Sequence, residues 1–128
     1  MGLDNGIVLK VKSTELPLWV QKMIEFTPYN GVDICYWRKC WGLRDTILTK
    51  VVYDYGDSRY NLLEGDIHEI RKILRYFSNR KRWEDEGRSI WAYEDIRRRL
   101  FKQRIVLWWL ERYLRKNPTV ECYFYDSY

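Results

Sequence analysis

The residue type best suited to acid–base chemistry at neutral pH is histidine, and the chain has one, His68. Asp66, Glu69, Arg71 and Lys72 are its neighbours in the sequence, and such groups can assist proton transfer. His68 falls on the polar face of a predicted amphipathic helix, however, where an exposed histidine without a catalytic role is the ordinary finding. The sequence contains no nucleophile elbow, glycine-rich phosphate loop or metal motif. It therefore favours a non-enzymatic protein and leaves enzymatic activity open.

Cysteine chemistry is the next possibility, and the three cysteines are Cys35, Cys40 and Cys122. They form no C-x-x-C pair, and the spacing of Cys35 and Cys40 has no partner pair or suitable histidine elsewhere, which argues against a zinc site. An odd number of cysteines also argues against a disulfide framework. We expect reduced, mostly buried thiols in a cytosolic protein, with no metal and no cofactor.

A pattern of rings and cations follows the longest predicted helix, residues 90–116. The members that share one face of a helical wheel are Trp91, Arg98, Lys102, Trp109, Arg112 and Lys116. Flat rings alternating with cations suit a single-stranded nucleic acid or an acidic protein groove. We predict a binding surface here. The alternative is that the two tryptophans pack under neighbouring loops while the cations are solvated.

A second candidate site surrounds Arg44, which lies among tryptophans on the apolar face of a predicted helix. Two interpretations are open. Arg44 forms a structural salt bridge with an acidic residue, or Trp37, Arg38, Trp41 and Arg44 line a pocket for an anionic ligand.

The elements that must position these residues follow from hydrophobic periodicity. Strand-like alternation predicts strands over 7–12, 32–37 and 119–125. Helical spacing of apolar residues predicts helices over 38–52, 67–77 and 90–116, with Asp66 as the N-cap of the second. We therefore predict an α+β fold with a small antiparallel sheet of about three strands. Three helices cover one face of it, the longest near the C-terminus, in a single domain over residues 1–128.

Three further segments are less regular. Residues 16–26 fit a short helix or an edge strand, and residues 53–60 fit a loop or a short strand. Residues 78–88 carry blocks of opposite charge and predict a charged loop.

The charge is divided unevenly along the chain. Residues 1–64 carry 8 basic and 8 acidic side chains, whereas residues 65–128 carry 15 and 10, so the net charge of +5 belongs to the second half. Arginine supplies 11 of those 15 basic groups, and its planar guanidinium suits phosphate and carboxylate. This half of the chain indicates an anionic macromolecular partner.

The longest apolar run, Ile105–Leu110, has six residues, whereas a membrane-spanning helix needs about 20. We expect no membrane association and a cytoplasmic location. Because this run is apolar on all sides of a helix, it must be buried on every side or form an interface. Self-association through Val106, Trp109 and Tyr113 is one prediction.

Two segments, MGLDNGI (residues 1–7) and CYWRKCWGLR (residues 35–44), resemble small proteins encoded by bacteriophages and prophages of Gram-positive bacteria. They cover 17 of the 128 residues. The resemblance implies the cytosol of a bacterial host and an accessory phage role. It implies no activity and carries no site residue.

From these observations we expect a phage-type accessory protein that acts as a non-enzymatic binding module. Its contact surface is the basic, tryptophan-containing helix face, and its partner is a nucleic acid or an acidic protein. The alternatives are a small ligand-binding or enzymatic domain with its pocket at Trp37, Trp41 and Arg44, and a structural homodimer.

Overall fold

The computed structural model describes residues 4–24, 31–52, 59–85 and 92–127 of the chain. In chain order, their elements are β1 (Asp4–Leu9), a 3₁₀ turn (Ser13–Glu15), α1 (Leu18–Met23), β2 (Val32–Arg38), α2 (Trp41–Ile47), a π-helical turn (Leu48–Val52), β3 (Arg59–Asn61), α3 (Glu64–Phe77), α4 (Arg80–Asp85), α5 (Tyr93–Lys116) and β4 (Cys122–Ser127). The predicted α+β class is confirmed, and α5 is the longest helix of these ranges.

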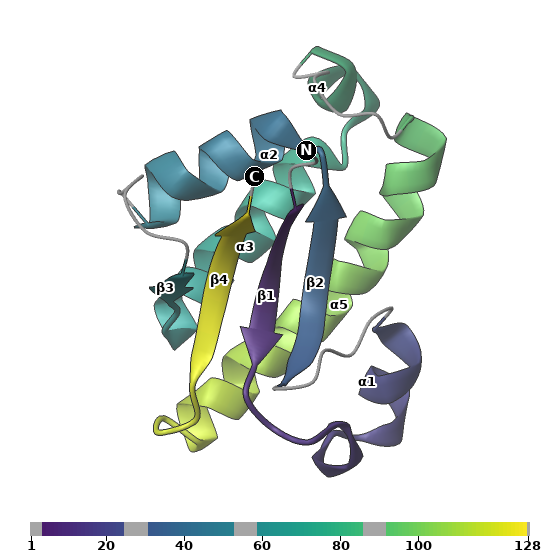
Figure 1. The fold of residues 1–128 in the computed structure, drawn as a ribbon. Helices are drawn as coiled ribbons and strands as arrows, with labels where there is room; N and C mark the ends of the chain where they lie inside the picture. Colours follow the sequence, from purple (N-terminus) through teal and green to yellow (C-terminus); the bar gives the residue numbers. More distant parts are fainter. Residues whose placement is uncertain (1–3, 25–30, 53–58, 86–91, 128) are drawn as a thin grey trace.

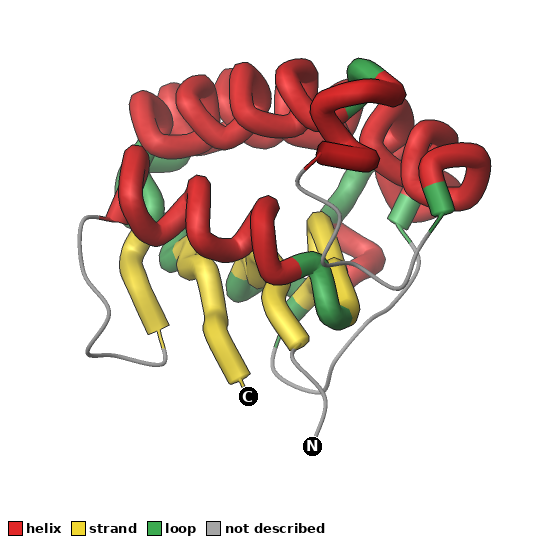
Figure 2. The backbone as a smooth tube through the Cα atoms, turned by 90° about the horizontal axis from the view of Figure 1, so that it is seen from above, coloured by secondary structure: helices red, strands yellow, loops and turns green. Residues whose placement is uncertain are grey.

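The strands form one antiparallel sheet in the order β2-β1-β4-β3. The two terminal strands, β1 and β4, therefore pair with each other in its centre. Figure 1 views the sheet from the side that no labelled helix covers, and Figure 2 shows the helices stacked on the other side. The additional strand, β3, has three residues, which is too short for a period of two to be read from the sequence.

Apolar side chains fill the space between the sheet and the helices. Ile7 and Leu9 from β1, Phe124 from β4, and Leu107 and Leu110 from α5 are all completely buried. Each such side chain contributes about 1.5–3 kcal/mol relative to an exposed one. The alternation in β1 thus predicted one of the two faces that meet in the core. The leucine stripe of α5, which is Leu100, Leu107, Leu110 and Leu114 at helical spacing, predicted the other.

The cysteines are buried and unbridged, as predicted. Burial, with the negative charge of Asp66 as a smaller cause, raises the pKa of the Cys122 thiol to about 12. This thiol stays protonated at neutral pH and packs as a small apolar side chain.

Three predictions were wrong in detail: the start of one helix, the N-cap of another, and a loop that contains a helix. The helix predicted from residue 38 begins at Trp41, because Lys39 adopts a φ of 54° and separates β2 from α2. Asp66 is not an N-cap: α3 begins at Glu64, and the Asp66 carboxylate accepts a hydrogen bond from the Leu63 N–H at 2.8 Å. The predicted charged loop contains α4, whose Trp83 is buried edge-on against Phe77.

Gly6 allows an aromatic ring to lie across the middle of the sheet. A Cβ atom at this position would lie 2.6 Å from both the Cys35 carbonyl oxygen and the Tyr125 ring. We expect Gly6→Ala to lower the free energy of unfolding by about 1–3 kcal/mol, because backbone and ring must both shift. The control is Gly65→Ala in α3, where nothing lies within 4 Å. That change should stabilise the helix by about 0.5–1 kcal/mol in the same urea titrations. Equal effects of the two changes would contradict this packing.

Candidate functional site

The face of α5 that points away from the core carries a line of exposed apolar side chains. Phe101 is 60% exposed and Trp108 43% exposed, and Ile105 is half-buried between them. Arg112 continues the line: its guanidinium carbon lies 3.9 Å from the centre of the Trp108 ring, and its Nη1 donates to the Trp108 carbonyl at 3.0 Å. We call Phe101, Ile105, Trp108 and Arg112 the ring ridge. Their spacing of four, three and four residues keeps them on one side of the helix.

Cations border the ring ridge on both sides. Helical spacing places Arg97, Arg104 and Arg115 toward α3, and places Arg98, Lys102 and Lys116 toward the opposite side. All six are exposed except Arg104, which is half-buried. Counted over its whole length, α5 carries eight basic and three acidic side chains, a net charge of +5. This equals the net charge of the chain.

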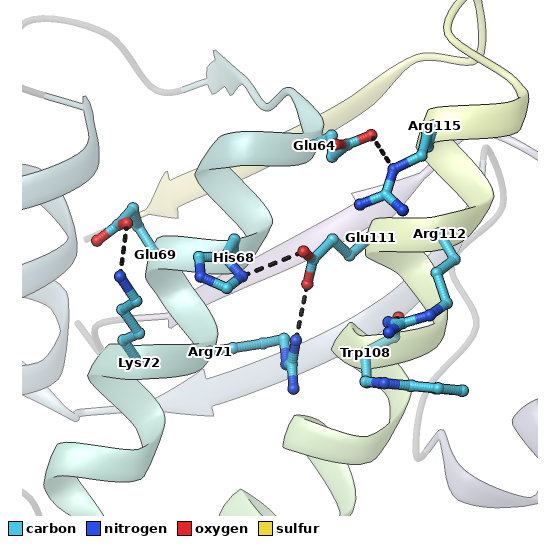
Figure 3. A network of polar contacts seen from close by, with 9 residues as sticks. All are labelled: Glu64, His68, Glu69, Arg71, Lys72, Trp108, Glu111, Arg112 and Arg115. Carbon is cyan, nitrogen blue, oxygen red and sulfur yellow. Dashed lines mark hydrogen bonds and ion pairs between the residues drawn. The ribbon is translucent and has the colours of Figure 1, made fainter.

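The seam between α3 and α5 is held by ion pairs (Figure 3). Arg115 donates to Glu64 at 3.0 Å, Arg71 donates to Glu111 at 2.7 Å, and His68 Nδ1 lies 3.1 Å from Glu111. Burial opposes the ionisation of Glu111, but the hydrogen bond from Arg71 and the adjacent charge of His68 hold its pKa below the ordinary value. Glu111 is therefore ionised at neutral pH and fastens α3 to α5.

These contacts take the place of an ion pair within α5. Glu111 and Arg115 are four residues apart in the order that favours an ion pair within one helix. Instead each pairs with a residue of α3, because α3 and α5 pack side by side over their length. The two acids of the seam, Glu64 and Glu111, thus face cations of the neighbouring helix. The polar face of α3 joins the outer face of α5 in one surface.

The predicted binding residues fall into three groups. Arg98, Lys102, Arg112 and Lys116 are exposed on α5, where the sequence placed them. Trp109 is partly buried, with its ring 4.9 Å from that of Tyr113. Trp91 lies outside the described residues.

Trp108 is the ring that the sequence analysis missed. It is the next residue to Trp109 in the all-apolar run Ile105–Leu110. Within this run, Val106 is 1% exposed, so it belongs to the core and offers no surface for self-association. The signal that could have found Trp108 is its spacing from Phe101 and Arg112, which places the three side chains on one side of the helix.

The structure settles the environment of Arg44. Its Nε and Nη2 donate to the two carboxylate oxygens of Asp126, each at 2.9 Å, and its Nη1 lies 3.1 Å from Asp45. Trp37 is buried and donates its indole N–H to Gln103 at 2.8 Å. Trp41 is half-buried beside the Arg44 guanidinium. An anionic ligand of Arg44 would have to compete with a carboxylate already bound in two hydrogen bonds.

The fourth member of that predicted pocket, Arg38, is exposed at the end of β2. Asp33, which also belongs to β2, is buried and pairs with Val8 of β1. Burial raises the pKa of Asp33 to about 7, although a hydrogen bond from Tyr125 opposes the rise. Oδ1 of Asp33 has no hydrogen-bond partner in the part of the chain that the structure describes.

A neighbouring pair has a simpler role. The Tyr36 hydroxyl donates to Asp4 at 2.7 Å, which joins β2 to β1. Burial, followed by this hydrogen bond and the charge of Asp4, raises the pKa of Tyr36 to about 12. Tyr36 is therefore a hydrogen-bond donor at neutral pH and not a base.

The ranges that the structure covers contain no group of three histidine, cysteine or acidic side chains placed to hold a metal ion. They also contain no helix long and apolar enough to cross a membrane. No protein-family model matches the chain, and no curated protein or solved structure matches it significantly. Its function is therefore inferred from its own side chains.

Proposed function

We propose that the protein is a non-enzymatic binding module that takes a single-stranded nucleic acid on the outer face of α5. The observation that carries this proposal is the exposure of Phe101 and Trp108 within a border of cations. Exposed rings supply stacking surfaces for bases of any sequence, and cations on either side attract the phosphates.

Charge distribution favours a nucleic acid over an acidic protein. The cations extend from Arg97 to Lys116, which is about 29 Å along a helix at 1.5 Å per residue. A nucleic-acid strand carries one negative charge per nucleotide, so it can contact cations along the whole of this length. The acids of the seam, Glu64 and Glu111, are occupied by cations from the neighbouring helix. We propose that such a module acts by occupying the strand.

The two alternatives have less support. A pocket at Trp37, Trp41 and Arg44 must displace Asp126 from Arg44. A homodimer through Val106 must open the core.

The test compares two tryptophans of equal exposure. Trp108 on α5 is 43% exposed and Trp19 on α1 is 42% exposed. We expect Trp108→Ala to weaken the binding of a fluorescent oligo(dT) of about 12 nucleotides by about 1–3 kcal/mol, or roughly 5- to 150-fold. Trp19→Ala should leave the affinity nearly unchanged, and fluorescence anisotropy measures both.

Two outcomes would overturn the proposal. One is equal loss of affinity in both variants. The other is an oligonucleotide that does not bind while polyglutamate does, which would identify the surface as a site for acidic protein.

A further inference from the structure

The seam between α3 and α5 contains more cations than its acids can neutralise. Arg71 uses Nη1 to bind Glu111, and its Nε is buried without a hydrogen-bond partner among the described residues. Arg75 lies one turn further along α3, and Arg104 lies one turn before Trp108 on α5. No carboxylate of the described ranges forms an ion pair with Arg75 or Arg104.

The packing of α3 against α5 places these three arginine residues toward the same end of the seam. Glu64 faces Arg115, and Arg71 faces Glu111, so the two helices are antiparallel. Moving one turn further therefore leads to Arg75 on α3 and to Arg104 on α5. Figure 3 shows Arg71 reaching from α3 toward the turns of α5 that carry Glu111 and Trp108.

We propose that this end of the seam, Arg71 with Arg75 and Arg104, is a phosphate site. The inference rests on the proposed function, because it assigns one phosphate of the bound strand to a defined place beside the ring ridge. A guanidinium group can donate two parallel hydrogen bonds to a phosphate, and three of them supply both the donors and the charge. Glu111 acts as a positioning residue, since its hydrogen bond fixes the Arg71 side chain across the seam.

The direct probe is inorganic phosphate, followed by nuclear magnetic resonance of the arginine Nε–H groups. We expect a saturable shift of the Arg71 signal that chloride at the same ionic strength does not produce. Arg71→Ala is unsuitable as the main variant, because it also breaks the pair with Glu111. The variant Arg75→Gln/Arg104→Gln breaks no described ion pair, and it should weaken phosphate binding by about 10-fold or more.

The matched control is Arg98→Gln/Lys116→Gln, which removes two positive charges from the side of α5 that faces away from the seam. It should retain the phosphate-dependent shift of Arg71. Loss of the shift to the same degree in both double variants would contradict a defined site, as would a shift that chloride reproduces.

The oligonucleotide distinguishes this inference from the proposed function. If oligo(dT) binds to the wild type but phosphate gives no saturable shift, the phosphate site is wrong and the binding function stands. If phosphate binds at the seam but oligo(dT) does not bind, the proposed function fails, and the strand is excluded as the source of the phosphate. Binding of both, with both weakened in Arg75→Gln/Arg104→Gln, supports the two together.

Discussion

Replacing Asp126 with alanine is expected to lower the free energy of unfolding by about 3–5 kcal/mol, the usual cost of leaving a buried charge without its partner. Arg44 is 8% exposed and Asp126 6% exposed. The Asp126 carboxylate accepts hydrogen bonds from Arg44 on α2 and from Asn5 on β1. Its removal therefore loosens three elements at once. Urea unfolding of the two proteins measures the difference.

A double variant separates the cost of an unpaired Arg44 from the stabilisation that the Arg44–Asp126 ion pair contributes. Arg44→Met/Asp126→Asn removes both charges and keeps an acceptor for Asn5, so it should recover most of the loss. The surface control is Arg115→Met, which breaks the exposed pair with Glu64 and should cost at most about 1 kcal/mol. If Asp126→Ala is as stable as Arg115→Met, the Arg44 guanidinium is solvated or paired with another residue in the variant, which would contradict the prediction.

The second large effect concerns Asp33 and pH. Its pKa is about 7 in the folded chain, against an ordinary value of 3.8. Between these values the folded state holds a proton that the unfolded state has lost, so stability falls as pH rises. At a pH above 7, the difference between these two pKa values lowers the free energy of unfolding by at most about 4 kcal/mol.

Asp33→Asn replaces the titrating carboxyl group with a neutral amide and keeps the size of the side chain. We expect the variant to be more stable than the wild type at about pH 8, with the advantage shrinking toward about pH 4, where Asp33 is protonated in the folded state. Urea titrations at several pH values measure the free energy of unfolding of both proteins. Taking the difference removes the contributions of the other titrating groups, because both proteins share them. A constant difference across that range would contradict the assignment to Asp33.

The sequence predicted those parts of the fold that depend on long periodic patterns. The leucine stripe of α5 and the alternation of β1 predicted which faces are buried. The pairing of the two terminal strands does not follow from either pattern, because it joins the two ends of the chain. The sequence failed to predict α4, because a six-residue segment as charged as this one forms a helix only when Trp83 packs against Phe77. Such a contact depends on tertiary structure, which a local pattern does not contain.

The candidate site was predicted in outline. The predicted cations of α5 are exposed, but Trp109 was chosen where Trp108 is the exposed ring. Two adjacent tryptophans point in directions about 100° apart around the helix, and an all-apolar run does not indicate which of them is exposed. The contact between the rings of Trp109 and Tyr113 leaves Trp108 as the more exposed of the two. The contribution of α3 was missed because its contact with α5 joins residues about 40 positions apart, as Arg71 and Glu111 show.

The salt dependence of oligonucleotide binding tests the central claim most directly. If about five of the cations on the outer face of α5 contact phosphates, the logarithm of the affinity should fall linearly with the logarithm of salt concentration, with a slope of about −3.5. The affinity for oligo(dT) would then drop about 100-fold between about 50 and 200 mM salt. An affinity that is flat over this range, or the absence of binding at the lower concentration, would contradict the account.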